Sequence, residues 1–391
     1  MTYTETQERS KKRLRNSYEL APSLKKLKAI NSPPPKPELI EPLPEITFNQ
    51  NKQSVLSITN LKEPLKLQLE YPIPEINEYE ILVSNKAIGL NPIDWKGHKY
   101  GFIKLIPRID GRESSGICVK RGSKVENFKI NDKVIISSTS YRDCRTSTFQ
   151  QFTAIDSRLC WKLPNNFSFE DGATIGVGLV TAGIIIYNSF KFDLKLNPPI
   201  HKNNQKTLLI WGGSTIVGIY LTQLGKIHGL KIISIANIKY KNYLKSIGVD
   251  YVVDRFKSNN DIKNEIETIS PNGIEFAVDC ISKETSQNII NIIDEINRET
   301  TNENKTKFSS IVGIPKEIPN SIELKEVIIK KFHEDKEFGS KFIEITTHYL
   351  NNFKIKPTRY KQYKGGLEKI TDALKDLEKI GANGEKYVVT V

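Results

Sequence analysis

The chain has 391 residues, of which 38% are hydrophobic, and its 58 Lys and Arg against 45 Asp and Glu give a formal net charge of +13. This length favours two domains over one core, and the hydrophobic content argues against a wholly disordered chain. The sequence lacks a run of about 18 consecutive apolar residues, so we expect no integral membrane segment. Four widely spaced cysteines fit neither a disulfide framework nor a cysteine zinc knuckle.

Residues 1–45 differ from the rest of the chain. Basic clusters at 11–15 and 25–28 precede a proline-rich stretch that begins at Pro33, and we expect a disordered extension. The two clusters fit either a bipartite nuclear import signal or a simple solvated tail. An apolar signal core is missing and acidic residues are present, which argues against secretory and mitochondrial targeting. We therefore expect a cytoplasmic protein, with a nuclear location as the alternative.

Residues 46–175 have the pattern of a β-rich domain. Segments 80–88, 116–119 and 133–137 read as short strands, and 89–92 is expected to end the first of them in a turn. Polar turn residues such as Asn131 and Asp132 lie between the strands. Many short strands with polar turns predict a mixed or barrel-like β domain.

Residues 207–314 alternate between buried strands and helices, which predicts a doubly wound parallel sheet and an α/β fold class. The expected strands are 207–211, 230–236, 250–254, 274–280 and 308–314. An amphipathic helix at 366–379 and a final strand at 385–391 are expected to return to the first domain. The predicted division is therefore 46–175 completed by 320–391, with a cofactor domain at 176–319 between them.

A glycine turn follows the strand at 207–211 and precedes a helix. Such a helix N-terminus offers free N–H groups and positive potential to a pyrophosphate. Gly213 and Gly218 occupy the first and third places of the dinucleotide fingerprint, but Thr215 occupies the second, where its side chain is expected to hinder the phosphate. The pattern alone also fits a purely structural turn. Cofactor contacts are assigned here to Gly213, Ser214, Thr215, Val217 and Gly218.

The end of the next strand indicates which nucleotide is bound. An acidic residue there usually holds the ribose hydroxyls of NAD. Here the position is the neutral Asn237, Lys239 and Lys241 follow, and the first acid is Asp250. This favours NADPH through its 2′-phosphate, although the lysines also fit an ordinary helix surface.

Several stretches resemble the zinc-independent quinone reductase and enoyl reductase branch of the medium-chain dehydrogenase/reductase superfamily, including its fungal enoyl reductase-like members. They are residues 86–96, 111–116, 176–183, 212–218, 245–250 and 384–389. The resemblance implies a GroES-like catalytic domain interrupted by a Rossmann cofactor domain. In this branch a threonine at the position of Thr215 is ordinary.

The chain departs from the zinc alcohol dehydrogenases of that superfamily at two ligand positions. Ile93 stands where they have a Cys, and Arg112 stands where they have a His. Without these ligands there is nothing to polarise an alcohol oxygen, so we expect no metal site. The loop between 137 and 147 is short, which suggests an open substrate cleft.

The resemblance implies NADPH-dependent hydride transfer to an activated C=C bond (enone or enoyl) or to a quinone, with a small-molecule substrate. It places Asn91 near the nicotinamide and Thr181 near the nicotinamide amide, and Tyr100 is a candidate proton donor. Asn91–Pro92 also fits a simple turn at the end of a strand. The resemblance also allows a homodimer, since dimers are common in the family.

Two other functions remain as alternatives. The first is a catalytically weak or inactive dinucleotide-binding adaptor, whose basic tail contacts a membrane or nuclear partner. The second is nucleic-acid binding through 354–364, where Tyr360 and Tyr363 lie among basic residues. A solvated surface is the favoured reading of that stretch, and we expect no nucleic-acid partner.

Overall fold

The computed structural model of the chain describes residues 51–101, 103, 105–138, 142–198, 206–299 and 305–391. The chain divides into two compact units, Met1–Glu45 and Ile46–Val391, and every described residue belongs to the second. The predicted disorder and import signal of residues 1–45 therefore fall outside the described residues.

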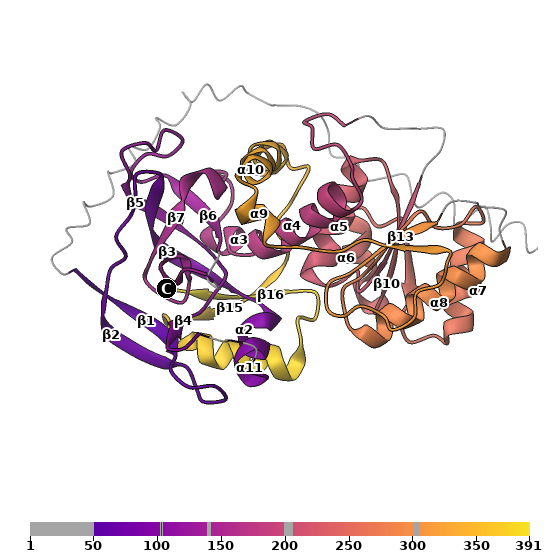
Figure 1. The fold of residues 1–391 in the computed structure, drawn as a ribbon, viewed down its shortest axis with the longest axis horizontal. Helices are drawn as coiled ribbons and strands as arrows, with labels where there is room; N and C mark the ends of the chain where they lie inside the picture. Colours follow the sequence, from indigo (N-terminus) through magenta and orange to yellow (C-terminus); the bar gives the residue numbers. More distant parts are fainter. Residues whose placement is uncertain (1–50, 102, 104, 139–141, 199–205, 300–304) are drawn as a thin grey trace, which may run out of the picture. The chain divides into compact units, whose positions relative to one another are not determined.

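Two sheets make up the β-rich part of the second unit (Figure 1). One has the order β15–β16–β3–β5–β6–β8, with β7 also paired to β3, and the other has the order β2–β1–β4. The strands from the first part of the chain are β1 (Lys52–Ile58), β2 (Lys66–Pro72), β3 (Glu80–Leu90), β4 (Arg108–Ile109), β5 (Glu113–Arg121), β6 (Lys133–Ser137), β7 (Phe152–Asp156) and β8 (Cys160–Lys162). Short 3-10 turns lie at Cys144–Thr146 and Ser157–Leu159. The predicted β-rich domain is thus confirmed.

β3 is the central strand, and it runs further than the sequence predicted. The expected turn at 89–90 is wrong, because β16 pairs with β3 as far as Leu90 and extends the ladder. The chain leaves the sheet at Asn91, which is the N-cap of helix α2 (Pro92–Lys99). A proline at the first helical position suits this start, since its missing N–H would have no helical partner.

The parallel sheet follows the predicted alternation of strands and helices. Its order is β11–β10–β9–β12–β13–β14, and all neighbouring strands are parallel. The strands are β9 (Thr207–Trp211), β10 (Lys231–Ala236), β11 (Tyr251–Asp254), β12 (Phe276–Asp279), β13 (Thr306–Ser310) and β14 (Ile322–Leu324). The helices are α5 (Ile216–Ile227), η4 (Ile238–Tyr240), α6 (Lys241–Ser246), α7 (Asn259–Ile269) and α8 (Lys283–Glu299).

Apolar side chains of this sheet pack on both faces, which confirms the doubly wound arrangement. Leu208 and Ile210 of β9 join one core cluster with Leu221 of α5. Their neighbour Leu209 joins a second cluster with Ile289 of α8. Successive residues of a strand point to opposite faces, so helices on both sides bury the whole strand.

β13 ends earlier than the predicted strand 308–314. The Ser310 hydroxyl donates to the Gly313 carbonyl at 2.8 Å and accepts from the Gly313 N–H at 3.3 Å, which bends the chain out of the sheet. β14 then extends the parallel sheet past the predicted boundary at residue 319. The predicted division into domains stays a prediction.

The C-terminal segment returns to the first sheet. β16 (Lys386–Thr390) pairs with β3 and with β15 (Tyr360–Lys364). Between them lies the predicted amphipathic helix, α11 (Lys369–Ile380), which ends at Gly381 with φ +75°. Helices α9 (Lys331–Glu334) and α10 (Lys336–Asn351) precede the return.

Residues 169–189 link the two halves of the unit. They form α3 (Phe169–Gly172), α4 (Gly176–Gly183) and a π-helical turn at Ile184–Ser189. By length and composition the stretch could cross a membrane, a possibility that a search for unbroken apolar runs did not raise, but 78% of its most apolar window is buried inside the structure. Here it serves as a core helix, and α4 packs directly against α5: a Cβ on Gly178 would lie 2.7 Å from Ile216 Cγ2.

Candidate functional site

A tight turn joins β9 to α5 and presents the first turn of the helix. Gly212 makes the turn with φ +88°, a conformation that favours glycine. Thr215 is the N-cap, and its Oγ1 accepts from the Gly218 N–H at 3.1 Å. The side chain of Thr215 thus caps its own helix, and the expected hindrance of the phosphate stays a prediction. The N–H groups of Ile216 and Val217 lie in the first turn, where a helix has no internal acceptors.

Two glycines in the turn are required by close packing. A Cβ on Gly213 would lie 1.8 Å from Ser234 Oγ of β10, and one on Gly218 would lie 2.5 Å from the Gly212 carbonyl oxygen. These contacts bring the helix start close to the strand ends. Ser214, Thr215 and Val217 stay half-buried along the rim. We call residues 212–218 the cradle.

The cradle lies where the strand order reverses. β9 has β10 on one side and β12 on the other, so the chain turns in opposite directions from it. In open parallel sheets, ligands bind at this point, outside the carboxyl ends of the strands. Asp279 at the end of β12 fixes the facing loop by accepting from the Ser282 N–H and the Ser286 hydroxyl, and burial raises its pKa.

Cationic and aromatic side chains surround the end of β10. Asn237 accepts from the Lys239 N–H at 3.0 Å and begins η4, while Lys239 and Lys241 are both exposed. Arg359 comes from the C-terminal return, and its guanidinium lies 4.0 Å from the ring centre of Tyr243. Sequence analysis missed Arg359, because 116 residues separate it from Tyr243 and no local pattern links them.

The first acid after β10 lies at the amino ends of the parallel strands, opposite the end at which the cradle lies. Asp250 precedes β11, pairs with Lys226 Nζ at 3.0 Å and accepts from the Ile232 N–H at 2.7 Å. Asp250 is therefore fully engaged there, away from the cradle.

Thr181 lies in α4 and is 2% exposed. Its hydroxyl donates to the Val177 carbonyl at 2.7 Å, which leaves its lone pairs as acceptors. Since α4 packs against the first turn of α5, Thr181 belongs to the helix beside the cradle.

Asn91 is the centre of a buried network that joins three distant segments. Its Nδ2 donates to Glu113 Oε1 at 2.8 Å, and its Oδ1 accepts from Lys386 Nζ at 2.8 Å. Lys386 also forms an ion pair with Glu113, and these two side chains are 2% and 0% exposed. The other carboxylate oxygen of Glu113 accepts from the Val177 N–H at 2.9 Å. The amide of Asn91 is thereby held at both ends.

A second group of charges lies on the other side of Asn91. Asp94 accepts from the Asn91 N–H at 2.7 Å, and its second oxygen is 3.2 Å from Arg112 Nε. Arg112 also faces Asp110, at 3.9 Å. Burial, followed by repulsion from Asp110, raises the pKa of Asp94 to about 7, although Arg112 opposes the shift.

Tyr100 lies at the end of α2, and 59% of it is exposed. Its ring centre is 6.0 Å from that of Trp95. The structure does not bring Tyr100 into the network around Asn91, so its role as a proton donor stays a prediction.

The two positions that depart from a zinc site now have a structural setting. Ile93 is exposed in the first turn of α2, and Arg112 carries a positive charge towards Asp94. Within the described ranges, no group of three or more His, Cys, Asp or Glu side chains could hold a metal ion.

The structure therefore gathers the predicted residues into three places. Gly213, Ser214, Thr215, Val217 and Gly218 share the cradle, and Asn237, Lys239 and Lys241 follow β10. Asn91 bonds to Glu113 directly, whereas Thr181 is linked to it only through Val177. Glu113 and Lys386 fall within the stretches 111–116 and 384–389 that carry the family resemblance, and neither was predicted to have a role. Lys386 begins β16 and is followed by the buried Tyr387, Val388 and Val389, so a charge at the start of an apolar strand was the signal that could have marked it.

Comparison with known proteins gives the same architecture. The alcohol dehydrogenase GroES-like domain family matches residues 77–180. A trans-enoyl reductase of Fusarium sp. is 26% identical over 345 residues, which cover 84% of this chain and 96% of the relative. A crystal structure of an alcohol dehydrogenase superfamily protein from Novosphingobium aromaticivorans has a TM-score of 0.72 at 18% identity, covering 87% of this chain and 100% of that one. A putative NADPH:quinone reductase from Bacillus thuringiensis has a TM-score of 0.69 at 15% identity, covering 87% and 98%.

Proposed function

We propose that the chain is an oxidoreductase of the medium-chain dehydrogenase/reductase superfamily, and that it acts as an NADPH-dependent, zinc-independent reductase of an activated C=C bond or a quinone. The observation that carries the proposal is the cradle at the switch point of the parallel sheet. The trans-enoyl reductase relative, and the structural likeness to a protein described as a putative NADPH:quinone reductase, support the same class of reaction.

The cradle fits the pyrophosphate of a dinucleotide. The close approach of Gly213 to β10 and of Gly218 to the turn leaves the backbone open to a ligand at the start of α5. The unbonded N–H groups of the first helical turn and the positive end of the helix favour an anion. Ser214 adds a hydroxyl at the rim. We assign the pyrophosphate to residues 213–218.

The end of β10 fits a 2′-phosphate better than free ribose hydroxyls. Lys239 and Lys241 are exposed there, and Arg359 lies on Tyr243. Asp250, the first acid after β10, is bound to Lys226 at the amino ends of the parallel strands. A phosphate carries almost two negative charges at neutral pH and is strongly stabilised by Arg and Lys. These contacts favour NADPH over NADH.

When bound, NADPH supplies a hydride, which needs no metal. The residues of this chain bind and orient the reactants. Glu113 and Lys386 fix the amide of Asn91, and Thr181 offers an acceptor to the nicotinamide amide. Zinc-independence rests on Ile93 and Arg112, whose side chains cannot replace the thiolate and imidazole that a catalytic zinc requires.

A steady-state assay tests this function. We expect the purified full chain to oxidise NADPH when given cyclohex-2-enone, a 2-enal or a 1,4-benzoquinone, and to leave primary alcohols with NADP⁺ unchanged. NADPH fluorescence is recorded in parallel. Tight NADPH binding without turnover of any acceptor would favour the dinucleotide-binding adaptor, and absence of binding would refute both functions.

A further inference from the structure

Arg112 has hydrogen-bond donors that no acceptor among the described residues uses. Its Nε lies 3.2 Å from Asp94 Oδ1 and its Nη2 lies 3.9 Å from Asp110 Oδ1. Even so, Arg112 Nε, the facing oxygen of Asp94 and both oxygens of Asp110 are buried without a hydrogen-bond partner among the described residues. Charge attraction thus holds one edge of the guanidinium. Its Nη1 nitrogen makes no hydrogen bond to a described residue.

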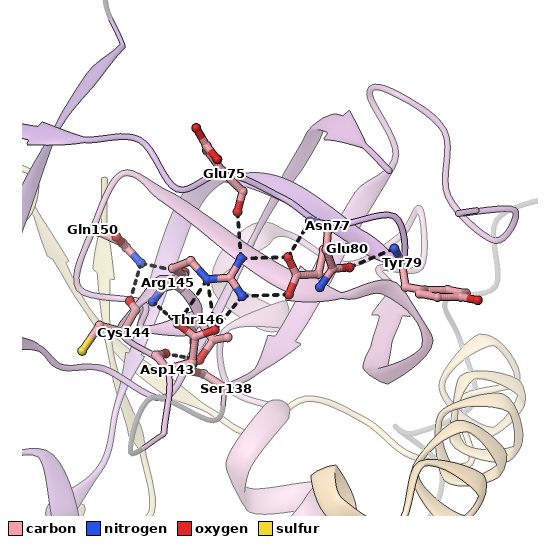
Figure 2. A network of polar contacts seen from close by, with 10 residues as sticks. All are labelled: Glu75, Asn77, Tyr79, Glu80, Ser138, Asp143, Cys144, Arg145, Thr146 and Gln150. Carbon is pink, nitrogen blue, oxygen red and sulfur yellow. Dashed lines mark hydrogen bonds and ion pairs between the residues drawn. The ribbon is translucent and has the colours of Figure 1, made fainter. Parts of the chain in front are cut away.

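Arg145 shows what a structural arginine looks like in the same domain (Figure 2). Its Nη1 and Nη2 donate to the two oxygens of Glu80 at 3.0 and 3.1 Å, and its Nη1 also donates to the Glu75 carbonyl at 2.8 Å. Nε and Nη2 donate to Asp143 as well. Every nitrogen of Arg145 is used within the fold, whereas Arg112 has two buried carboxylates beside it and bonds to neither.

Arg112 lies one helix away from the cradle. The next residue, Glu113, accepts from the Val177 N–H in the first turn of α4, and that helix packs on Ile216 at the start of α5. Asp94, on the other side of Arg112, is bonded to Asn91. Arg112 is therefore linked through Asp94 to Asn91, and it precedes Glu113, which holds the amide of Asn91.

Only the cation of this group is accessible. The side chain of Arg112 is 16% exposed, while those of Asp94 and Asp110 are 0% and 1% exposed. Because the pKa of Asp94 is raised to about 7, that carboxyl is partly protonated at neutral pH and adds little negative charge. A planar guanidinium with free donors binds an oxygen that carries or acquires negative charge.

We propose that Arg112 binds the carbonyl oxygen of the acceptor and stabilises the enolate that forms there. The inference rests on the proposed function and narrows its substrates to compounds whose C=C bond is conjugated to a carbonyl. As hydride adds to the β carbon, the C=C electron pair moves to the bond between the α and carbonyl carbons, and the carbonyl pair moves to the oxygen. Arg112 keeps its protons and holds this oxygen by hydrogen bonds. A solvent proton then adds to the α carbon and restores the carbonyl.

Steady-state kinetics with cyclohex-2-enone and NADPH test this role. We expect Arg112→Gln to lower kcat/KM at least about a hundredfold, mostly through kcat, because loss of one oxyanion donor has an effect of that size. Arg112→Lys keeps the positive charge but lacks the planar pair of N–H donors, and we expect a smaller loss of kcat/KM, about tenfold. The NADPH dissociation constant should stay within about twofold in both. Arg158→Gln, in an ion pair with Asp156, is the matched control and should keep wild-type kinetics.

A binding measurement provides a readout that does not depend on turnover. 4-Nitrophenolate resembles an enolate, and its absorbance reports its protonation. We expect the wild-type protein to bind the phenolate and lower its pKa, Arg112→Lys to retain part of this effect, and Arg112→Gln to bind at least about tenfold more weakly. Wild-type kinetics and wild-type phenolate binding in Arg112→Gln would overturn the inference. If Arg112→Gln fails to fold, undiminished kcat/KM in Arg112→Lys would overturn it. A wild-type protein that binds no NADPH would contradict the proposed function instead.

Discussion

The cradle and the charge network around Asn91 are built in opposite ways. The cradle consists of seven consecutive residues, and its chemistry comes from backbone N–H groups and the end of a helix. The network joins Asn91, Glu113 and Lys386, which come from three segments, and its chemistry comes from their buried polar and charged side chains. A backbone-built site depends on how closely glycines pack. A side-chain network depends on each charge having its partner.

The largest effect is expected when the network loses its cation. Lys386→Met leaves Glu113 buried without a counter-charge, and we expect the free energy of unfolding to fall by about 3–5 kcal/mol. Urea denaturation measures this. Lys124→Met removes an exposed ion pair with Glu78 and should have no resolvable effect. Equal stability of the two variants would show that the buried pair is not what holds the three segments together.

The pH dependence of stability reports the second group of charges. The pKa of Asp94 is about 7 in the folded protein and 3.8 in the unfolded chain. Between pH 3.8 and pH 7 the folded protein therefore keeps the Asp94 proton, whereas the unfolded chain has lost it. The contribution of Asp94 to the free energy of unfolding therefore falls as the pH rises from about 4 to about 7, by a few kcal/mol at most. Above pH 7 this contribution is constant.

Asp94→Asn isolates this contribution, because it removes the titration and keeps an oxygen for the Asn91 N–H. Burial lowers the pKa values of His228 and His333 to about 4, so these residues make the free energy of unfolding rise with pH over the same range. The wild type and the variant share this rise, and it cancels in their difference. The wild-type unfolding free energy minus that of the variant should decline with pH through this window. A difference that is flat from pH 4 to 7 would contradict the raised pKa.

The close packing of Gly213 against Ser234 should determine how stable the cradle is. Gly213→Ala places a Cβ 1.8 Å from Ser234 Oγ, and we expect a loss of about 1–3 kcal/mol together with weaker NADPH binding. Adding Ser234→Gly removes the clashing side chain and should restore most of the NADPH affinity. Unfolding and fluorescence titration of both variants measure the two effects. No recovery in the double variant would mean that Ser234 is not the obstacle.

The sequence predicted local features well and distant partners poorly. The first four predicted strands of the parallel sheet, from 207 to 280, lie close to their predicted positions, because each has its own hydrophobic pattern and turn residues. β3 and β13 end elsewhere than expected, since the pairing of β16 extends one and a serine turn shortens the other. Arg359 and Lys386 reach their partners only because the C-terminal segment packs back against the first sheet. Contacts across hundreds of residues leave no periodic signal.

The smallest effect is expected at Tyr100. A general acid that donates a proton in the transition state contributes about 10²–10⁴-fold. Tyr100 is largely exposed, so water reaches the same region, and we expect Tyr100→Phe to lower kcat less than about tenfold. Kinetics with cyclohex-2-enone measure this. A loss of a hundredfold or more would establish Tyr100 as the donor.

The central claim is that the cradle binds NADPH and that cations after β10 recognise its 2′-phosphate. Fluorescence titration of the full chain with NADPH and with NADH tests it most directly, using the wild type, Lys239→Ala/Lys241→Ala and Arg359→Ala. We expect the wild type to bind NADPH at least about tenfold more tightly than NADH, and the variants to lose affinity for NADPH far more than for NADH. Equal affinities in the wild type, or equal losses for both cofactors in the variants, would contradict the account.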